Sequence, residues 1–371
     1  MRKYLSSEDL SSHVDFQIES SFSDLKTEVM LVQVRAEESP ITDIGVGGSV
    51  ATSPIVHKGA VYFGACDKKF YAVDAETGEM IWSFLTDGPI NGSPTLDNSV
   101  LYFGSYDCSL YALTLEGKLL WKFPTQGKIF SKPCVYNDVV YFGSYDGNLY
   151  AVNTETGKEI WRFKTNGYVL SWPSIYKDAV YFGSNDYNFY KLTLDGKMLW
   201  RFRTGKEAGI FNSIFHNDIV YFGSFDRNIY ALKADTGSLV WKRPFSEPPN
   251  TVIARKDNIL FFGSRNCNFY AITTEGKLLW EFKTGYLAGG GVSVFGDTVY
   301  FGGDDNCLYA FDAKSGEVVW KFPTKGPVAH TNPAFYNNKI YFGCFERTSP
   351  KLMSFLIFMS PPQTTAECRL D

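Results

Sequence analysis

Short apolar runs of strand length alternate with small groups of polar turn residues along most of the chain. Between residues 131 and 163, four such runs are separated by Asn-Asp at 137–138, Asp-Gly-Asn at 146–148 and Thr-Gly at 156–157. Runs of this length bounded by Gly, Asn and Asp are typical of antiparallel strands joined by tight turns. Aromatic residues make up 17% of the chain and helix formers are not concentrated in any segment, so the pattern predicts an all-β protein.

The same pattern recurs along the sequence, and each copy contains Tyr-Phe-Gly or Phe-Phe-Gly, with steps of 39 to 41 residues between glycines. These repeat glycines are Gly64, Gly104, Gly143, Gly183, Gly223, Gly263, Gly302 and Gly343. A tryptophan follows each of the first seven, at Trp82, Trp121, Trp161, Trp200, Trp241, Trp280 and Trp320. A four-stranded sheet cannot bury both faces alone, so the repeat predicts blades stacked radially into a β-propeller, with these residues in structural roles.

The distance from repeat glycine to tryptophan alternates between 18 and 17 residues, which indicates a duplicated two-blade unit and an even number of blades. We therefore expect an eight-bladed β-propeller of four-stranded antiparallel blades. Residues 50–345 hold seven complete repeats and a partial eighth, after which the pattern ends.

Another segment must then supply the outer strands of the last blade. We expect strands from the N-terminal segment 1–49, at residues 14–19 and 28–34, to close the ring non-covalently. The apolar run at residues 352–359 is the competing source, and residues 346–371 are otherwise expected to form an irregular or disordered tail.

The turn before the outer strand carries a recurring motif in the odd copies. It reads AVDAETGEMIW (72–82), AVNTETGKEIW (151–161), ALKADTGSLVW (231–241) and AFDAKSGEVVW (310–320). These motifs resemble the pyrroloquinoline-quinone-like (PQQ-like) propeller repeat family over about residues 50–345. The resemblance implies that each motif tryptophan docks between neighbouring blades. Members of that family include quinoprotein dehydrogenases, an outer-membrane assembly lipoprotein and soluble propellers, so the fold alone does not select a function.

The composition limits which classes of partner the protein is expected to bind. With 36 basic and 40 acidic residues the net charge is −4, which argues against nucleic-acid binding. The seven cysteines show no zinc-type spacing and the first residues lack an apolar signal core, so we expect free thiols and a cytoplasmic protein. The apolar run at 352–359 falls far short of the ~20 residues of a transmembrane helix. True quinoproteins typically carry a vicinal cysteine pair and calcium, and this chain has no Cys-Cys dipeptide.

Positions that differ between copies are the candidates for function. The slot eleven residues before each repeat glycine holds Lys132, Trp172, Asn212 and Asn332, with His330 nearby. In propellers of this kind these loops ring the mouth of the central channel, so the side chains are candidate ligand contacts. The alternative is that they solvate a water-filled channel.

A ring of acidic side chains lies three residues after the repeat glycines, as in Asp67, Asp107 and Asp146. Aspartates in this hairpin are expected to bind their own turn backbone, with a cation or basic-peptide site as the alternative.

No arrangement of residues in the sequence indicates a catalytic site. We expect a non-catalytic scaffold that binds a protein partner on the disc face or the loop rim, and the irregular loops 206–211 and 246–250 support this. The alternative is a small-molecule binder or quinoprotein-type oxidoreductase that holds PQQ with calcium at the channel mouth.

Overall fold

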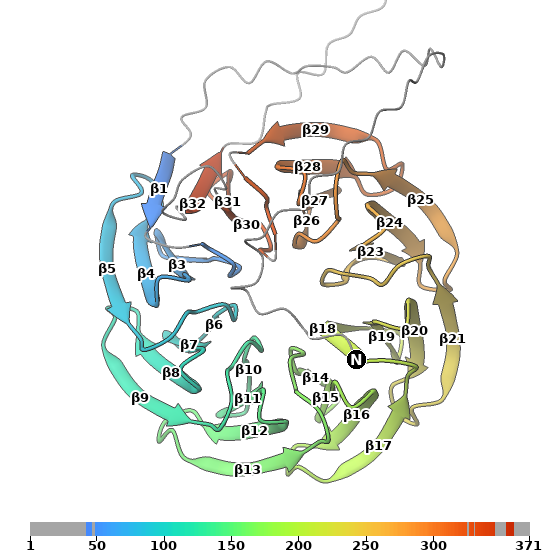
Figure 1. The fold of residues 1–371 in the computed structure, drawn as a ribbon, viewed down its shortest axis with the longest axis horizontal. Coiled ribbons are helices and arrows are strands. Elements are labelled where there is room, and N and C mark those ends of the chain that lie inside the picture. The colour runs from blue at the N-terminus through green and yellow to red at the C-terminus, as the bar shows by residue number, and fades with distance from the viewer. Residues whose placement is uncertain (1–41, 47–48, 325, 330, 346–353, 360–371) are drawn as a thin grey trace, which may run out of the picture. The chain divides into compact units, whose positions relative to one another are not determined.

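Strands begin wherever the sequence alternates β-branched and aromatic residues, and they end at turn residues. The computed structural model describes residues 42–46, 49–324, 326–329, 331–345 and 354–359. These residues form 32 strands in four-stranded antiparallel sheets arranged around a central axis (Figure 1). Within this part of the chain, no helix is long and apolar enough to cross a membrane.

Seven blades each consist of four consecutive strands, numbered here from the axis outwards. Blade 1 contains β2 (Ile55–His57), β3 (Ala60–Gly64), β4 (Lys69–Asp74) and β5 (Met80–Leu85). Blade 2 contains β6 (Thr95–Asp97), β7 (Val100–Gly104), β8 (Ser109–Thr114) and β9 (Leu119–Pro124). Blade 3 contains β10 (Cys134–Tyr136), β11 (Val139–Gly143), β12 (Asn148–Asn153) and β13 (Glu159–Lys164). Blade 4 contains β14 (Ser174–Tyr176), β15 (Ala179–Gly183), β16 (Asn188–Thr193) and β17 (Met198–Arg203). Blade 5 contains β18 (Ala208–His216), β19 (Ile219–Ser224), β20 (Asn228–Lys233) and β21 (Leu239–Pro244). Blade 6 contains β22 (Ala254–Lys256), β23 (Ile259–Gly263), β24 (Asn268–Thr273) and β25 (Leu278–Lys283). Blade 7 contains β26 (Val292–Phe295), β27 (Thr298–Gly303), β28 (Cys307–Asp312) and β29 (Val318–Pro323).

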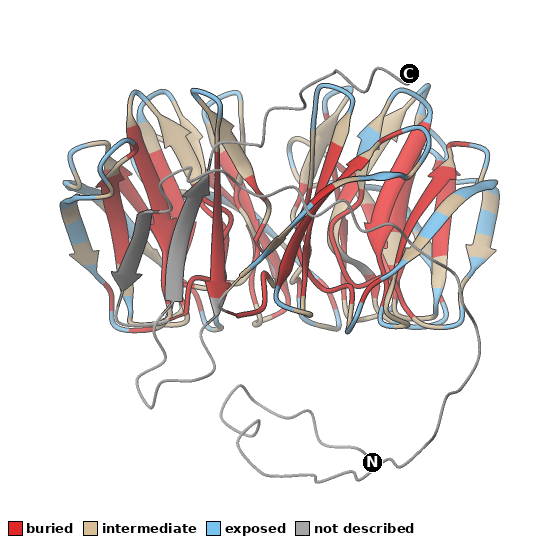
Figure 2. Cartoon of the chain, turned by 90° about the horizontal axis from the view of Figure 1, so that it is seen from above, coloured by how far each residue is buried: buried red, intermediate tan, exposed pale blue. Residues whose placement is uncertain are grey.

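The core lies between blades. In each complete blade the second and third strands are largely buried, whereas the outermost strand is partly exposed (Figure 2). Aromatic rings join neighbouring blades: Phe70 stacks on Phe103 at 4.2 Å and Phe189 stacks on Phe222 at 4.0 Å between centroids. Stacked rings add to the burial of apolar surface, so each blade depends on its neighbours for a core.

The repeat tryptophans connect each blade to the next. The indole N–H of Trp82 donates to the carbonyl of Leu115 in blade 2 at 2.9 Å, and the ring lies under Gly117. Gly117 has a φ of +81°, and a Cβ there would lie 2.7 Å from the ring, so both the backbone conformation and the close approach require glycine. Equivalent bonds run from Trp121, Trp161, Trp200, Trp241 and Trp280 to the turns of their next blades.

The structure corrects the predicted eight-bladed ring closed by N-terminal strands. Seven blades arise from consecutive strands, and the remaining four-stranded sheet is not a further repeat but a composite of both ends of the described chain. Its order is β30 (Ala334–Tyr336), β31 (Lys339–Phe345), β32 (Ser354–Met359) and β1 (Thr42–Val46).

The competing source therefore supplies the third strand of this composite sheet, and the N-terminal segment supplies only the fourth. The physical reason is that the chain after Phe345 lacks the Thr-Gly turn and the tryptophan strand, while residues 354–359 pair directly with β31. The proposed strands at 14–19 and 28–34 lie outside the described residues. The composite sheet packs between blades 7 and 1, and the Tyr341 hydroxyl donates to the Ala75 carbonyl at 3.1 Å.

Candidate functional site

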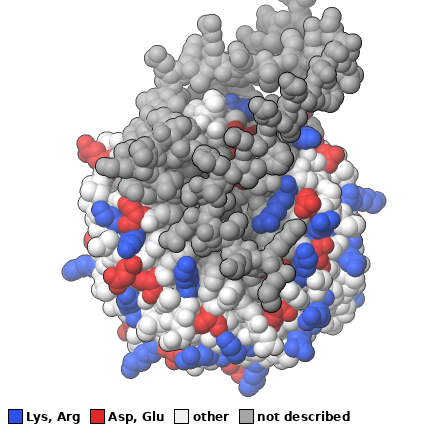
Figure 3. All heavy atoms as spheres, viewed as in Figure 1, with Lys and Arg blue, Asp and Glu red and all other residues white. Residues whose placement is uncertain are grey.

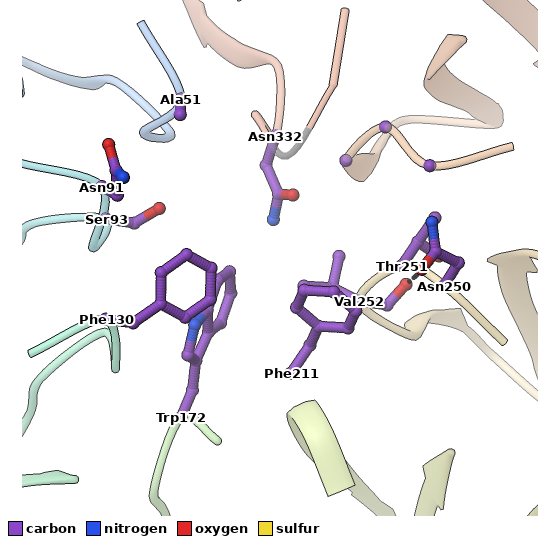
Figure 4. Close-up of a pocket in the computed structure, with 13 residues that line it drawn as sticks. Ala51, Asn91, Ser93, Phe130, Trp172, Phe211, Asn250, Thr251, Val252 and Asn332 are labelled. Carbon is purple, nitrogen blue, oxygen red and sulfur yellow. Dashed lines mark hydrogen bonds between the residues drawn. The ribbon is translucent and has the colours of Figure 1, made fainter. Parts of the chain in front are cut away.

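Loops that lead into the innermost strands surround one end of the central channel. They form a hollow of about 350 Å³, a volume that includes open solvent. We call it the channel mouth. It is lined by Ala51, Asn91, Ser93, Phe130, Trp172, Phe211, Asn250, Thr251, Val252, Gly289, Gly290, Gly291 and Asn332 (Figure 4).

Aromatic side chains form one wall of the channel mouth. Phe130 and Trp172 project from the loops before β10 and β14, and Phe211 projects from β18 beside Val252 (Figure 4). Trp172 and Phe211 pack against the apolar cluster of blades 6 and 7 that includes Val252 and Val292. These contacts join blades 4 and 5 to blades 6 and 7, so apolar side chains form part of the wall of the channel mouth.

Phe211 stands at a position where the other blades carry Thr, Ser or Gly. In blade 1 the equivalent Thr52 hydroxyl accepts a hydrogen bond from the Gly64 N–H at 3.0 Å and donates to the Gly64 carbonyl at 2.9 Å. Phe211 cannot make these bonds, and β18 instead starts early, with a register shift between Ala208 and Ser213. The Phe211 carbonyl accepts from the Trp172 N–H at 2.5 Å, so the irregular strand also fixes Trp172.

Amide side chains occupy the other side of the channel mouth. Asn332 points into the hollow opposite the aromatic wall (Figure 4), and its backbone N–H donates to the Ser53 hydroxyl at 3.0 Å. Among the described residues, its side-chain amide has no hydrogen-bond partner, and it is half-buried. A Cβ at Gly291 would lie 2.2 Å from Asn332 Oδ1, so glycine at this position leaves room for the amide.

Two further amides, Asn91 and Asn250, are held by outer neighbours. The Asn91 Oδ1 atom accepts from the Cys66 thiol at 3.0 Å, and burial, followed by the charge of Asp67, raises the pKa of Cys66 to about 11, so the thiol stays protonated. The Asn250 Oδ1 atom accepts from Arg265 Nε at 3.1 Å. Both contacts use the carbonyl oxygen of the amide, which leaves the NH₂ groups as donors near the hollow.

The four described residues of the predicted slot divide into two groups. Trp172 and Asn332 line the channel mouth. The Asn212 side chain instead bridges to the backbone of Ile253, donating to its carbonyl at 3.0 Å and accepting from its N–H at 2.9 Å. Lys132 places its ammonium 5.6 Å from the centre of the Trp172 ring, and it does not line the hollow. His330 lies outside the described residues.

The Lys132 amine is buried beside the channel mouth. Burial lowers its pKa, because a protonated amine loses solvation there, and no carboxylate pairs with it among the described residues. The Trp172 ring face partly replaces that solvation. Lys132 therefore contacts the Trp172 ring and does not line the channel mouth.

None of the described residues that line the channel mouth has an ionisable side chain. On the face drawn in Figure 3, basic and acidic side chains are interspersed around the described rim. Calcium takes six to eight oxygen ligands that usually include carboxylates, and pyrroloquinoline quinone is itself a carboxylic acid. The lining residues therefore do not fit PQQ with calcium. Among the described residues, no three His, Cys, Asp or Glu side chains gather as a metal site.

The acidic ring lies in the hairpins after each second strand, and its members bind their own turns. Asp146 accepts from the Tyr150 hydroxyl at 2.7 Å, from the Asn148 N–H at 3.0 Å and from the Gln126 N–H at 3.0 Å. In blade 6 Asn266 takes the same place and donates to the Tyr270 hydroxyl at 2.7 Å. This satisfied geometry favours the turn interpretation over a cation site.

The sequence did not single out Phe130, Phe211, Asn91 or Asn250 as lining residues, although Phe211 and Asn250 end the irregular loops 206–211 and 246–250 that it indicated as a partner surface. A signal existed for Phe211, since it replaces the Thr, Ser or Gly that the other copies carry at this position. Phe130 and Asn91 stand two residues before the slot, a second variable tier.

The ring of four-stranded blades and the docked tryptophans define a propeller of the PQQ-repeat class. The family model described as outer membrane protein assembly factor BamB matches residues 23–130, 110–272 and 265–344, so the chain belongs to this PQQ-repeat family. A comparison with curated proteins finds no match.

Three solved structures share the fold. The computationally designed Ika8 protein has a TM-score of 0.73 and 17% identity, over 84% of this chain and 97% of that one. BamB from Moraxella catarrhalis has a TM-score of 0.69 and 16% identity, over 86% and 100%. Quinohemoprotein alcohol dehydrogenase from Comamonas testosteroni has a TM-score of 0.72 and 13% identity, over 89% and 77%. These identities support a common fold alone.

Proposed function

We propose that this protein is a non-catalytic scaffold that binds a protein partner at the channel mouth and the loops around it. The observation that carries the proposal is the lining itself, whose described residues combine three aromatic side chains with unpaired hydrogen-bonding groups and include no ionisable side chain. Tryptophan and other aromatic side chains at the centre of a contact face are the usual energetic anchors of protein interfaces.

An aromatic cluster continues outward from the channel mouth on the same face. Tyr145 lies between Tyr106 and Tyr168, at 6.3 and 5.1 Å between ring centroids, and the Lys128 ammonium lies 4.9 Å from the Tyr106 ring. Tyr168 is 51% exposed. Tyrosines combine a large contact area with a polar tip, which suits a protein contact at the rim of the mouth.

The BamB family match is consistent with this role, since the name describes an assembly factor. The quinone alternative receives no support from the lining, for the reasons of charge given above. A cytoplasmic location stays a prediction.

Parallel purifications from native cells test the proposal. The Phe130→Ala/Trp172→Ala double variant removes two aromatic anchors, and Phe295→Ala is the matched control. Phe295 is 61% exposed at the far end of β26, on the opposite face. We expect a stoichiometric partner with wild type and Phe295→Ala that is lost from the double variant while its Tm stays close to wild type. A partner retained by the double variant, or absent from all three, contradicts the proposal.

A further inference from the structure

The channel mouth has two halves that suit different parts of one ligand. Its apolar half consists of Phe130, Trp172, Phe211 and Val252, and its polar half is dominated by amides and by the backbone of Gly289–Gly291. An extended peptide has the same division, because an apolar side chain projects from a backbone that both donates and accepts hydrogen bonds.

Two groups at the channel mouth are free to bind such a backbone. The Asn332 side chain has no partner among the described residues, and its carbonyl and NH₂ groups match the N–H and C=O of one residue in an extended strand, which point to the same side. The indole N–H of Trp172 likewise has no acceptor in the described part of the chain, whereas the tryptophan of every blade from 1 to 6 donates to a backbone carbonyl. Half-buried groups of this kind gain most when a ligand completes their hydrogen bonds.

The charge of a ligand side chain decides whether the apolar half can bind it. None of the described lining residues is ionisable. The charged groups beside the lining lie at the polar half, where Arg265 binds Asn250 at 3.1 Å and Asp304 Oδ2 would lie 2.7 Å from a Cβ at Gly289. At the apolar half, the Lys132 ammonium lies 5.6 Å from the centre of the Trp172 ring. A carboxylate or ammonium placed against Phe130, Trp172 and Phe211 would lose water without gaining an oppositely charged lining residue, which is unfavourable. The walls are aromatic and aliphatic, so a large uncharged side chain is the complementary group.

We infer that the channel mouth binds an extended, uncharged peptide segment by one large apolar side chain. That side chain lies against Phe130, Trp172 and Phe211, while Asn332 pairs with the N–H and C=O of a neighbouring residue. The inference rests on the proposed scaffold function and adds the chemistry of the partner segment.

Blocked pentapeptides of the form acetyl-Gly-Ser-Xaa-Ser-Gly-amide test this chemistry, with Phe, Leu, Glu or Lys as Xaa. Protein labelled with 5-fluorotryptophan gives a fluorine NMR signal for Trp172, which the Trp172→Phe variant assigns. We expect the Phe and Leu peptides to shift this signal saturably, and to bind at least about tenfold more tightly than the Glu and Lys peptides.

A substitution of Asn332 tests the polar half of the channel mouth. Asn332→Ala should weaken binding of the Phe peptide about 3- to 10-fold, the effect of losing one or two hydrogen bonds. Asn166→Ala, an exposed asparagine in the loop between β13 and β14, is the matched control and should change nothing. Unchanged thermal unfolding of both variants shows that the fold is intact.

The inference is overturned if charged peptides bind as well as apolar ones, or if no apolar peptide shifts the Trp172 signal at millimolar concentration. Such a failure is distinguishable from failure of the scaffold proposal. A native partner still lost from Phe130→Ala/Trp172→Ala would leave the scaffold standing and only the peptide chemistry wrong.

Discussion

At the scale of single residues, a repeat position identifies which loop a side chain comes from but not where the side chain points. Of the residues in the slot before the innermost strands, Trp172 and Asn332 line the channel mouth. The slot grouped them with Asn212, which bonds to the Ile253 backbone, and with Lys132, which lies against the Trp172 ring. Side-chain direction depends on local packing, here on the early start of β18, and no spacing in the sequence records it.

Lys132 gives a prediction about stability and pH. Burial lowers the pKa of Lys132 in the folded state below the ordinary 10.5. Below that lowered pKa the buried amine is charged, and this charge destabilises the folded state relative to the unfolded state. As pH rises through the folded pKa towards 10.5, the unfolded state binds more protons and this penalty disappears. Lys132→Met should therefore raise the Tm at pH 7, and its advantage over wild type should shrink towards pH 10.

Thermal unfolding of both proteins across this pH range measures the effect. Comparing the two proteins cancels the other groups that titrate there. A Tm difference that is absent at pH 7, or that does not change with pH, would show that Lys132 is not desolvated in the folded state.

At the scale of elements, the sequence predicted most of the architecture, because each strand and turn repeats with its own chemistry. The tryptophan and the turn glycine are linked physically: Trp121 donates to the Thr154 carbonyl at 2.8 Å, and a Cβ at Gly157 would lie 2.6 Å from its ring. Both turn lengths keep this contact, as Gly117 and Gly157 show. The spacing alternation therefore reflects the turns and leaves the docking unchanged.

Trp121→Ala tests the docking. The substitution removes an interblade hydrogen bond and an aromatic contact with Tyr102 at 5.8 Å, so we expect it to lower the free energy of unfolding by about 3 kcal/mol. Leu120, the preceding residue on the same strand, is 50% exposed, and Leu120→Ala should cost less than about 1 kcal/mol. Urea unfolding measures both, and equal effects would argue against docking as the interblade link.

The acidic hairpins supply a second test at this scale. Asp146→Ala leaves the Tyr150 hydroxyl and two backbone N–H groups without their acceptor, so we expect a loss of about 2–3 kcal/mol. Asp146→Asn should lose less, since Asn266 fills the same position in blade 6. If both variants unfold like wild type in urea, the aspartates are not turn residues and a ligand role has to be reconsidered.

At the scale of the whole molecule, the sequence showed that an outside segment must complete the ring but not which one. The repeat stops at Phe345, and strand pairing between distant segments depends on register that a single sequence does not display. The structure pairs β32 with β31 and then β1 with β32. β1 therefore has no strand partner in the described chain except β32.

Truncation tests this order. Deleting residues 350–371 removes β32 and with it the pairing of β1, so it should lower the Tm more than deleting residues 1–46, which removes β1 alone. Deletion of residues 1–41 retains β1 and isolates its contribution. Differential scanning calorimetry of the three proteins gives the order, and a C-terminal deletion as stable as wild type would refute closure by β32.

The most direct test of the scaffold account is site-specific photo-crosslinking in native cells with benzoylphenylalanine. It is introduced in place of Phe130 at the channel mouth or Phe295 on the opposite face, so both substitutions replace a phenylalanine. The account predicts one dominant crosslinked protein from position 130, captured through an uncharged segment with a large apolar residue, and none of it from position 295. Equal capture from both positions, or none from position 130, would contradict it.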